Sequence, residues 1–303
     1  MANLSIPYFY MLIGLPASGK STIAKDLIKS SKDHITLSSD EIRKELYGDE
    51  TIQDNPEKVF ELMQKRAVDA LNNNKDVIYD ATNIRRKNRK HLLRNLPRCH
   101  KIAVIIWAKY ETCVQRDSKR ERTVGENVIH RMLRNFQPPY FDEGWNSIKT
   151  VYTDEQYNSR DYHEWVNCEH DNPHHNNTVA EHTHQVCREA IDFKLDKDIS
   201  DCGCTLFIAA HLHDIGKKLT KSFTNARGEK TDIAHYYDHH NVGSYLALGY
   251  ADINEMTTRQ KMLIVWLINA HMEPFFESKY YKNLTGKERK LLDALHQCDI
   301  KGA

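Results

Sequence analysis

The sequence predicts two domains: an α/β domain with a parallel sheet covered by helices on both faces, followed by an all-helical domain. Three observations support this prediction. Short apolar runs alternate with helical patterns over residues 1–153, and only helical patterns follow the polar segment 154–172. Of the 17 histidines, 13 lie after residue 153. The length of 303 residues and the charged fraction of 28% are typical of about two globular domains.

The elements of the first domain follow from apolar runs and helical spacing. We predict strands over Tyr8–Ile13, Ile35–Ser38, Val77–Asp80, Ile102–Ala108 and Lys149–Thr153. We predict helices over Gly19–Ser30, Asp40–Leu46, a segment that begins at Pro56, Glu111–Arg122 and Asn127–Asn135. Strands that alternate with helices form a parallel sheet, which gives a first domain over residues 1–153.

The second domain is expected over residues 173–303, after a linker over 154–172 that is rich in Tyr, Asn and His. We predict helices over 178–190, 203–213, 239–249, 257–270 and 286–298. The longest apolar runs are too short to cross a membrane, and the N-terminus lacks the pattern of a signal peptide. The seven cysteines form no CxxC pair, which favours reduced thiols. We therefore expect a cytoplasmic protein, or one in the host cytoplasm if a phage encodes it.

Charge separates the two halves. Residues 1–153 carry 26 basic and 19 acidic side chains, whereas residues 154–303 carry 17 basic and 23 acidic ones. The basic first half suits a polyanionic partner. The acidic, histidine-rich second half has the composition of a metal centre.

The segment GLPASGKS, Gly14–Ser21, fits the pattern GxxxxGK[ST] between a predicted strand and a predicted helix. Backbone N–H groups and the helix N-terminus would cradle the phosphates, Lys20 would reach the β- and γ-phosphates, and the Ser21 hydroxyl would hold Mg²⁺. We predict ATP with Mg²⁺ as the ligand. Its binding residues in this loop are Gly14, Ala17, Ser18, Gly19, Lys20, Ser21 and Thr22.

An acceptor site is predicted after the second strand, in SSDEIRKELYG. Asp40 can take a proton from a substrate hydroxyl, and Arg43, on the same helix face, can bind a substrate phosphate. The alternative is a helix-capping Asp with a solvated Arg.

Three further polar segments surround this site. Asp80, in DATN, lies where a carboxylate would support the Mg²⁺ shell, or it belongs to a turn. Arg116, Arg120 and Arg122 form either a lid over the transferred phosphoryl group or a solvated basic helix. The stretch 85–101 has eight basic and no acidic residues, which suits a nucleic-acid backbone or a solvated helix face.

The order of GxxxxGKS, SSDEIR, DATN and the basic lid resembles the P-loop 5′-hydroxyl polynucleotide kinase family over residues 8–153. The resemblance implies that Asp40 is the general base and Arg43 contacts the acceptor phosphate. It implies that Arg120 contacts ATP, with Arg116 beside it, and we also assign Asn83 and Arg86 to the acceptor. Kinases of other acceptors share these motifs.

Histidines and aspartates recur at predicted helix positions in the second half: His182, the adjacent pair His213 and Asp214, His239 or His240, His271 and Asp299. Imidazoles and carboxylates from several helices can converge on divalent metals. The segments HDIGK and NPHH…EHT resemble the HD phosphohydrolase superfamily over residues 173–303.

That resemblance implies one metal held by His182, His213, Asp214 and Asp299. It implies a second metal on His239 and His271, bridged by Asp214, and a substrate phosphate on Lys217. The metal can be Mn, Fe, Co, Ni or Zn, and one or two ions can be present. Metal-activated water would hydrolyse a phosphomonoester or a cyclic phosphodiester.

Together the two halves resemble a bifunctional enzyme that heals nucleic-acid ends. It would phosphorylate 5′-hydroxyl ends and remove 3′-phosphate, 2′-phosphate or 2′,3′-cyclic phosphate. Its partners would be nucleic-acid ends, with RNA favoured over DNA, and an RNA ligase in the same pathway. No membrane partner is expected. Two alternatives stay open: a nucleoside or small-metabolite kinase fused to an HD nucleotidase or cyclic-nucleotide phosphodiesterase, and a nucleotide-gated regulatory protein.

Overall fold

The computed structural model describes residues 6–30, 34–52, 54–171 and 178–302. Its contacts divide the chain into two compact units. The first comprises Met1–Ile129 with Pro139–Glu155, and the second comprises His130–Pro138 with Gln156–Ala303. The segment 130–138, which we placed in the first domain, therefore packs within the second unit. The expected boundary at 172–173 lies outside the described residues.

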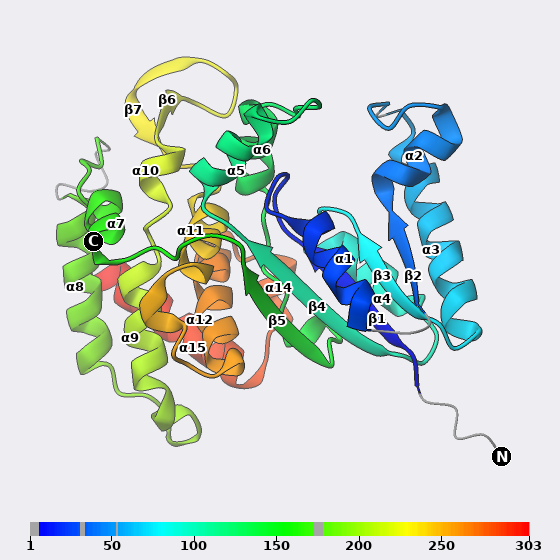
Figure 1. Cartoon of the computed structure of the whole chain (residues 1–303). Helices are drawn as coiled ribbons and strands as arrows, with labels where there is room; N and C mark the ends of the chain where they lie inside the picture. The colour runs from blue at the N-terminus through cyan, green and yellow to red at the C-terminus, as the bar shows by residue number, and fades with distance from the viewer. Residues whose placement is uncertain (1–5, 31–33, 53, 172–177, 303) are drawn as a thin grey trace. The chain divides into compact units, whose positions relative to one another are not determined.

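A five-stranded parallel sheet with the order β2-β3-β1-β4-β5 forms the centre of the first unit (Figure 1). The strands are β1 (Tyr8–Ile13), β2 (His34–Ser38), β3 (Asp76–Asp80), β4 (His100–Trp107) and β5 (Ser147–Tyr152). The helices are α1 (Lys20–Ser30), α2 (Ser39–Tyr47), α3 (Pro56–Asn72), α4 (Arg86–Arg94), α5 (Tyr110–Ser118) and the 3-10 turn η1 (Phe141–Glu143). Helix α6 (Glu126–Arg134) continues from the first unit into the second.

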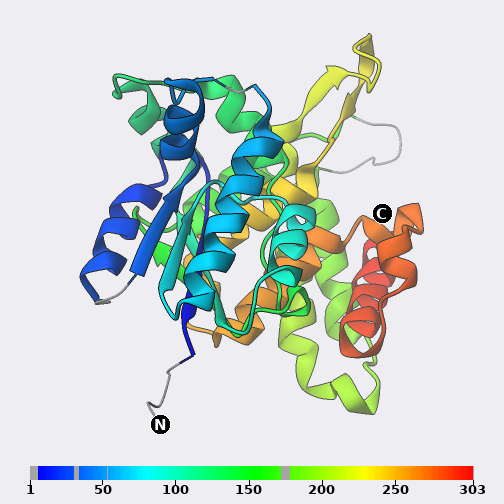
Figure 2. The ribbon, with the colours of Figure 1, turned by 90° about the vertical axis from the view of Figure 1, so that its right-hand side faces the viewer.

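Helices cover both faces of this sheet, as predicted. Figure 2 shows α1 on one face and α3 and α4 on the other. On the α1 face, Leu12, Ile78, Val104 and Ile106 form a buried cluster with Ala24 of the helix. The apolar strand runs thus have two buried faces, which is typical of a parallel sheet.

The register of the sheet places three polar segments together. Leu12 of β1 and Ser38 of β2 both pair with Asp80 of β3. The P-loop, the start of α2 and the end of β3 therefore meet at the carboxyl edge, where ligands bind in open parallel sheets.

Helix α5 ends at Ser118, four residues before the predicted end. The buried Asp117 carboxylate accepts hydrogen bonds from the backbone N–H groups of Val124 and Gly125 at 2.9–3.2 Å. This folds the chain back, so that Arg120 and Arg122 lie in a loop rather than on the helix.

The second unit is mainly helical. Its elements are α7 (Ser159–Val166), α8 (Val179–Asp192), η2 (Lys197–Cys202), α9 (Gly203–Leu212), α10 (Lys217–Thr220), α11 (His239–Leu248), η3 (Ala251–Ile253), α12 (Thr258–Ala270), α13 (Glu273–Phe276), α14 (Lys279–Lys282), α15 (Gly286–Lys301), and strands β6 (Ser222–Thr224) and β7 (Lys230–His235). Helix α12 contacts α9, α11 and α15. Because its residues Lys261–Ile268 are all buried, it forms the centre of the unit.

Two expectations for this half were wrong. The segment expected as a linker contains α7, whose first turn is closed by a capping box of Asn158 and Asp161 and whose Tyr162 and Trp165 are buried. The all-helical prediction missed the antiparallel hairpin β6–β7. Its turn is closed by Asn225, whose side chain accepts from the N–H groups of Arg227 and Glu229.

Within the described part of the chain, no helix combines the length and the apolar character that a membrane crossing requires.

The basic stretch 85–101 is partly internal. Arg89 of α4 is fully buried and forms a two-pronged ion pair with the buried Glu143, at 2.7 and 2.8 Å. Arg86 pairs with Asp142. These two side chains hold α4 against η1, which reduces the charge that this helix offers to a nucleic-acid backbone.

We predict that Arg89→Ala destabilises the first unit by about 3–5 kcal/mol, because it leaves the buried Glu143 carboxylate without its cation, with only the neutral N–H donors of Tyr140 and Trp145. Urea denaturation followed by circular dichroism measures this. The control is Arg66→Ala, which removes an exposed ion pair with Glu45 and should change stability little. Equal denaturation midpoints for the two variants would contradict the prediction.

Candidate functional sites

The P-loop has the geometry of a phosphate cradle. A Cβ on Gly14 would lie 2.5 Å from the Ile106 carbonyl oxygen, and Gly19 has φ +97°, so both positions require glycine. Among the described residues, the buried Ser18 Oγ finds no hydrogen-bond partner. A loop with close backbone approach and an unpaired buried hydroxyl fits a bound phosphate.

Lys20 and Asp80 lie beside this loop. The Lys20 ammonium donates to the carbonyl oxygens of Gly14 and Leu15 at 3.1 and 2.7 Å. The Ser21 hydroxyl donates to Asp80 Oδ2 at 3.2 Å. Hydroxyl and carboxylate oxygens together fit the coordination preference of Mg²⁺.

Burial shifts both ionisable groups towards neutrality. It lowers the pKa of Lys20 to about 8 against the opposing effect of Asp80, and the Arg120 charge lowers it further. Burial raises the pKa of Asp80, while Lys20 opposes that rise. Each charge thus stabilises the other in a partly desolvated site.

Asp40 and Arg43 form an ion pair at 2.8 Å on the first turns of α2. The Asp40 side chain is 54% exposed and that of Arg43 11%. Ser38, not Asp40, caps this helix, because its side chain accepts from the N–H of Glu41. The alternative of a capping Asp40 with a solvated Arg43 is therefore wrong.

The basic lid residues have different partners. Arg116 donates to the Thr153 carbonyl oxygen at 2.6 Å, and the Thr153 hydroxyl donates to the Ser18 carbonyl oxygen at 2.7 Å. Arg122 pairs with Glu50 at 2.8 Å and lies 3.8 Å from Asp40. Arg120 is exposed. The sequence did not indicate Thr153, or that Arg122 would be a second cation near Asp40, beside Arg43.

Two residues predicted to contact the acceptor, Asn83 and Arg86, have protein partners in this structure. The Asn83 side-chain amide donates to the Leu12 and Ala81 carbonyl oxygens at 2.7 and 3.2 Å. The Arg86 guanidinium pairs with Asp142. Both side chains support the edge of the sheet in this structure.

The second unit brings together the six side chains that the sequence predicts as metal ligands: His182, His213, Asp214, His239, His271 and Asp299. His182 Nε2 lies 3.3 Å from His213 Nε2 and 3.1 Å from Asp299 Oδ1. Asp214 Oδ2 lies 3.2 Å from His213 Nε2. These four residues, from α8, the end of α9 and α15, form the first donor group.

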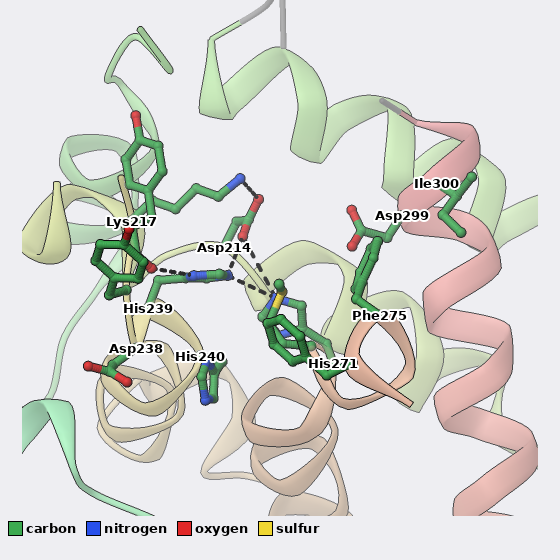
Figure 3. Close-up of a pocket in the computed structure, with 13 residues that line it drawn as sticks. Asp214, Lys217, Asp238, His239, His240, His271, Phe275, Asp299 and Ile300 are labelled. Atoms are coloured by element: carbon green, nitrogen blue, oxygen red, sulfur yellow. Dashed lines mark hydrogen bonds and ion pairs between the residues drawn. The ribbon is translucent and has the colours of Figure 1, made fainter. Parts of the chain in front are cut away.

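The second donor group uses the other oxygen of the same carboxylate. His239 Nε2 lies 3.0 Å from His271 Nε2 and 3.3 Å from Asp214 Oδ1 (Figure 3). His240 lines the pocket, but its ring centroid lies 6.3 Å from that of His271, whereas the His239 centroid lies 5.0 Å from it. Asp214 thus lies between both groups.

Each of the four imidazoles has its Nδ1 against a backbone carbonyl oxygen, at 2.7–3.0 Å. The carbonyls are those of Gly302 for His182, Ala210 for His213, Tyr236 for His239 and Ile268 for His271. A carbonyl only accepts, so Nδ1 carries the proton and Nε2 points inward. Facing Nε2 atoms at 3.0–3.3 Å need a positive charge between them, which a proton or a metal ion supplies. This donor set fits a divalent metal.

The ionisable groups of the cluster shift one another's pKa values strongly. Burial disfavours the charged forms of Asp214 and His213. The His213 and Lys217 cations nevertheless hold the pKa of Asp214 well below its usual range, and the two aspartates raise the pKa of His213 to about 10. Burial, and then His239, lower the pKa of His240 to about 3. A neutral His240 adds no charge to the pocket.

Four residues of the cluster line a pocket of about 600 Å³: Asp214, His239, His271 and Asp299. Lys217 enters it with its ammonium 2.6 Å from Asp214 Oδ2 and 3.1 Å from Nε2 of the buried His170. The sequence did not indicate His170, which lies in the segment expected as a linker. It also did not indicate the apolar lining residues Tyr236, Tyr237, Met272, Phe275, Phe276 and Ile300.

Comparison with known proteins supports the fold of the first unit. A family model described as an AAA domain matches residues 9–139. The first unit is therefore a parallel-sheet α/β P-loop domain of the kinase-like type. No curated protein matches the chain.

Solved structures resemble the chain weakly. The structure of a Pnkp1/Rnl/Hen1 RNA repair complex matches with 22% identity and a TM-score of 0.39, covering 42% of this chain and 43% of that chain. A gluconokinase from Sinorhizobium meliloti 1021 matches with 16% identity and a TM-score of 0.35, covering 48% of this chain and 83% of that one. The chain thus spans less than half the length of the repair structure, and these similarities carry no argument about activity.

We predict that Asp214→Ala removes most metal from the second unit, because one carboxylate contributes to both donor groups. Elemental analysis after dialysis against Mn²⁺, Co²⁺, Ni²⁺ or Zn²⁺ measures the bound ion per chain. His240→Ala is the matched control and should retain the wild-type content, whereas His239→Ala should lose part of it. Wild-type content in a folded Asp214→Ala protein would contradict the assignment.

Proposed function

We propose that the protein heals broken nucleic-acid ends. It phosphorylates a 5′-hydroxyl end with ATP, and it hydrolyses a 3′-phosphate, 2′-phosphate or 2′,3′-cyclic phosphate end. The observation that carries the proposal is the presence, in one chain, of a P-loop beside an Asp–Arg pair and of a six-residue metal-type cluster beside a lysine. Cleavage of RNA by many nucleases leaves both kinds of end. A ligase, by contrast, requires a 5′-phosphate and a free 3′-hydroxyl.

In the kinase reaction, Asp40 receives the proton of the 5′-hydroxyl as that oxygen attacks the γ-phosphorus of ATP. The bond from this phosphorus to the bridging oxygen breaks, and ADP leaves. The exposed Asp40 carboxylate can meet an incoming hydroxyl, and its partner Arg43 can bind the phosphate on the acceptor strand. The P-loop amides and Lys20 would hold the β- and γ-phosphates. Ser21 and Asp80 would hold Mg²⁺, which neutralises charge on the phosphates.

In the hydrolytic reaction, the six donors would hold one or two divalent ions: His182, His213, Asp214, His239, His271 and Asp299. The bound metal supplies a hydroxide near neutral pH and neutralises phosphate oxygens. Lys217 would contact the phosphate of the substrate, since its ammonium reaches the cluster. The Nδ1 hydrogen bonds of the four histidines fix the direction of each Nε2.

A nucleoside or small-metabolite kinase fused to an HD nucleotidase is the second candidate. The buried position of Arg43 beside Asp40 favours an acceptor that carries a phosphate near its hydroxyl, as a polynucleotide end or a nucleoside 3′-phosphate does. A nucleoside lacks that phosphate. The test offers labelled ATP to 5′-hydroxyl RNA and DNA oligonucleotides and to nucleosides, beside phosphate release from 3′-phosphate, 2′-phosphate and cyclic ends. Transfer to nucleosides alone would overturn the end-healing proposal.

We predict that the two activities separate by mutation. Lys20→Ala or Asp40→Asn should lower 5′-phosphorylation by roughly 10²–10⁴-fold and leave end hydrolysis unchanged, because removal of a catalytic base or phosphate cation has effects of this size. Asp214→Ala should abolish end hydrolysis and leave 5′-phosphorylation unchanged. Near-full phosphorylation by Asp40→Asn would show that the base is assigned wrongly.

We predict that Arg43→Ala raises the KM for the oligonucleotide far more than the KM for ATP. Arg43→Lys should restore little, since a guanidinium binds phosphate through two parallel hydrogen bonds and an ammonium does not. Steady-state kinetics with each substrate varied measures the two values. Arg66→Ala, on the exposed surface, is the control. An equal rise in KM for the oligonucleotide and for ATP would indicate that Arg43 contacts ATP.

A further inference from the structure

Exposed apolar side chains gather on one side of the metal-type pocket. Phe275 is 47% exposed, Phe276 71% and Ile300 53%, and all three line the pocket together with Met272. Figure 3 shows Phe275 and Ile300 on the side of Asp299, away from Lys217. We call these four residues the apolar wall. The pocket therefore has a charged side and an apolar side.

The apolar wall is tied to the donor residues by the chain itself. Met272 directly follows His271, Phe275 lies one helical turn further along the same segment, and Ile300 directly follows Asp299. The Phe275 ring contacts His296 of α15 nearly at right angles, with the centroids 4.4 Å apart. The wall is thus placed by the same two segments that place two of the donors, and its distance from the cluster is fixed.

Phe275 and Phe276 present accessible phenyl rings beside the cluster, and of these Phe275 is the one that packs on His296 of α15. The two tyrosine rings in the lining already have partners: the Lys217 ammonium lies 5.6 Å from the Tyr236 ring centroid, and Tyr237 stacks on His235 at 5.3 Å. His296 meets Phe275 edge to face and covers at most one of its faces. Half-exposed aromatic rings beside a polar site favour a ligand that is partly apolar.

We infer that the apolar wall, with Phe275 at its centre, stacks the nucleobase of the terminal nucleotide whose phosphate lies at the Asp214 cluster. This inference rests on the proposed hydrolysis of nucleic-acid ends and specifies its substrate. A sugar phosphate or an inorganic phosphate has no flat apolar group to cover the wall, whereas every nucleotide has one. The volume of about 600 Å³ lies within the range of pockets for small molecules, so one nucleotide end fits.

Because stacking on an aromatic ring tolerates every base, the wall selects a nucleotide end without selecting its sequence. Because a pocket of about 600 Å³ accommodates one nucleotide rather than a base pair, the terminal base has to be unpaired to enter it. The site therefore prefers a single-stranded or frayed end over a blunt duplex end.

The experiment compares two 3′-phosphate oligonucleotides, one with a normal terminal nucleotide and one whose terminal sugar lacks the base. For wild type, the KM of the normal end should be about tenfold lower. Phe275→Ala should raise the KM of the normal end to that of the base-free end, with kcat unchanged, since stacking is uniform binding energy. Phe275→Trp should keep the preference. Phe207→Ala, which removes an exposed ring outside this pocket, is the matched control.

Equal KM values for the two ends in wild type, or an equal effect of Phe275→Ala on both, would overturn the inference. Absence of hydrolysis with every metal would instead refute the proposed function. In that case a binding measurement tests the inference. Uridine 3′-monophosphate and ribose 5-phosphate are titrated separately into the wild-type protein and the Phe275→Ala variant, and the dissociation constants are compared. Only the nucleotide should bind more weakly to the variant, and because the P-loop is the same in both proteins, the difference reports this pocket. Equal binding to both proteins would overturn the inference.

Discussion

The buried carboxylate of Asp214 is the interaction on which the second unit depends. It is 2% exposed, and a carboxylate so far from water costs several kcal/mol unless cations and donors surround it. Its partners come from separate helices: His213 ends α9, Lys217 begins α10, and His239 begins α11. His182 of α8 lies 3.5 Å from Asp214 Oδ2 and also contacts the second carboxylate of the cluster, Asp299 of α15. The helices therefore pack so that one anion is neutralised, and the same packing forms the pocket.

A similar constraint acts in the first unit, where the parallel sheet brings Lys20 and Asp80 together at its carboxyl edge. Neither charge is well solvated, and each lowers the cost of the other. The register of β1, β2 and β3 makes this pairing unavoidable, because the loops that follow all three strands lie side by side. Asp40 joins the site for the same reason, since α2 begins directly after β2.

The sequence predicted most of the fold because its strong signals are local. The GxxxxGKS loop, the apolar strand runs and the helical spacing after Pro56 each depend on near neighbours in the chain. The failures are residues whose role depends on distant partners. The basic pattern of α4 did not reveal that Arg89 is buried against Glu143, and the polar composition of 154–172 concealed α7. His170, Thr153 and Phe275 carried no local signal, because only folding brings them to a site.

Under the proposed function, the two sites must treat water in opposite ways. A kinase has to deliver the γ-phosphoryl group to a hydroxyl while it excludes water, which the loop with Arg120 and Arg122 can favour by covering the phosphates. A phosphohydrolase has to admit water and activate it, which needs an open pocket with metal donors, as around Asp214. One site cannot meet both demands, because the conditions that activate water would hydrolyse ATP. This gives a physical reason for two separate units, with phosphate held by backbone amides in the first and by metal-type donors in the second.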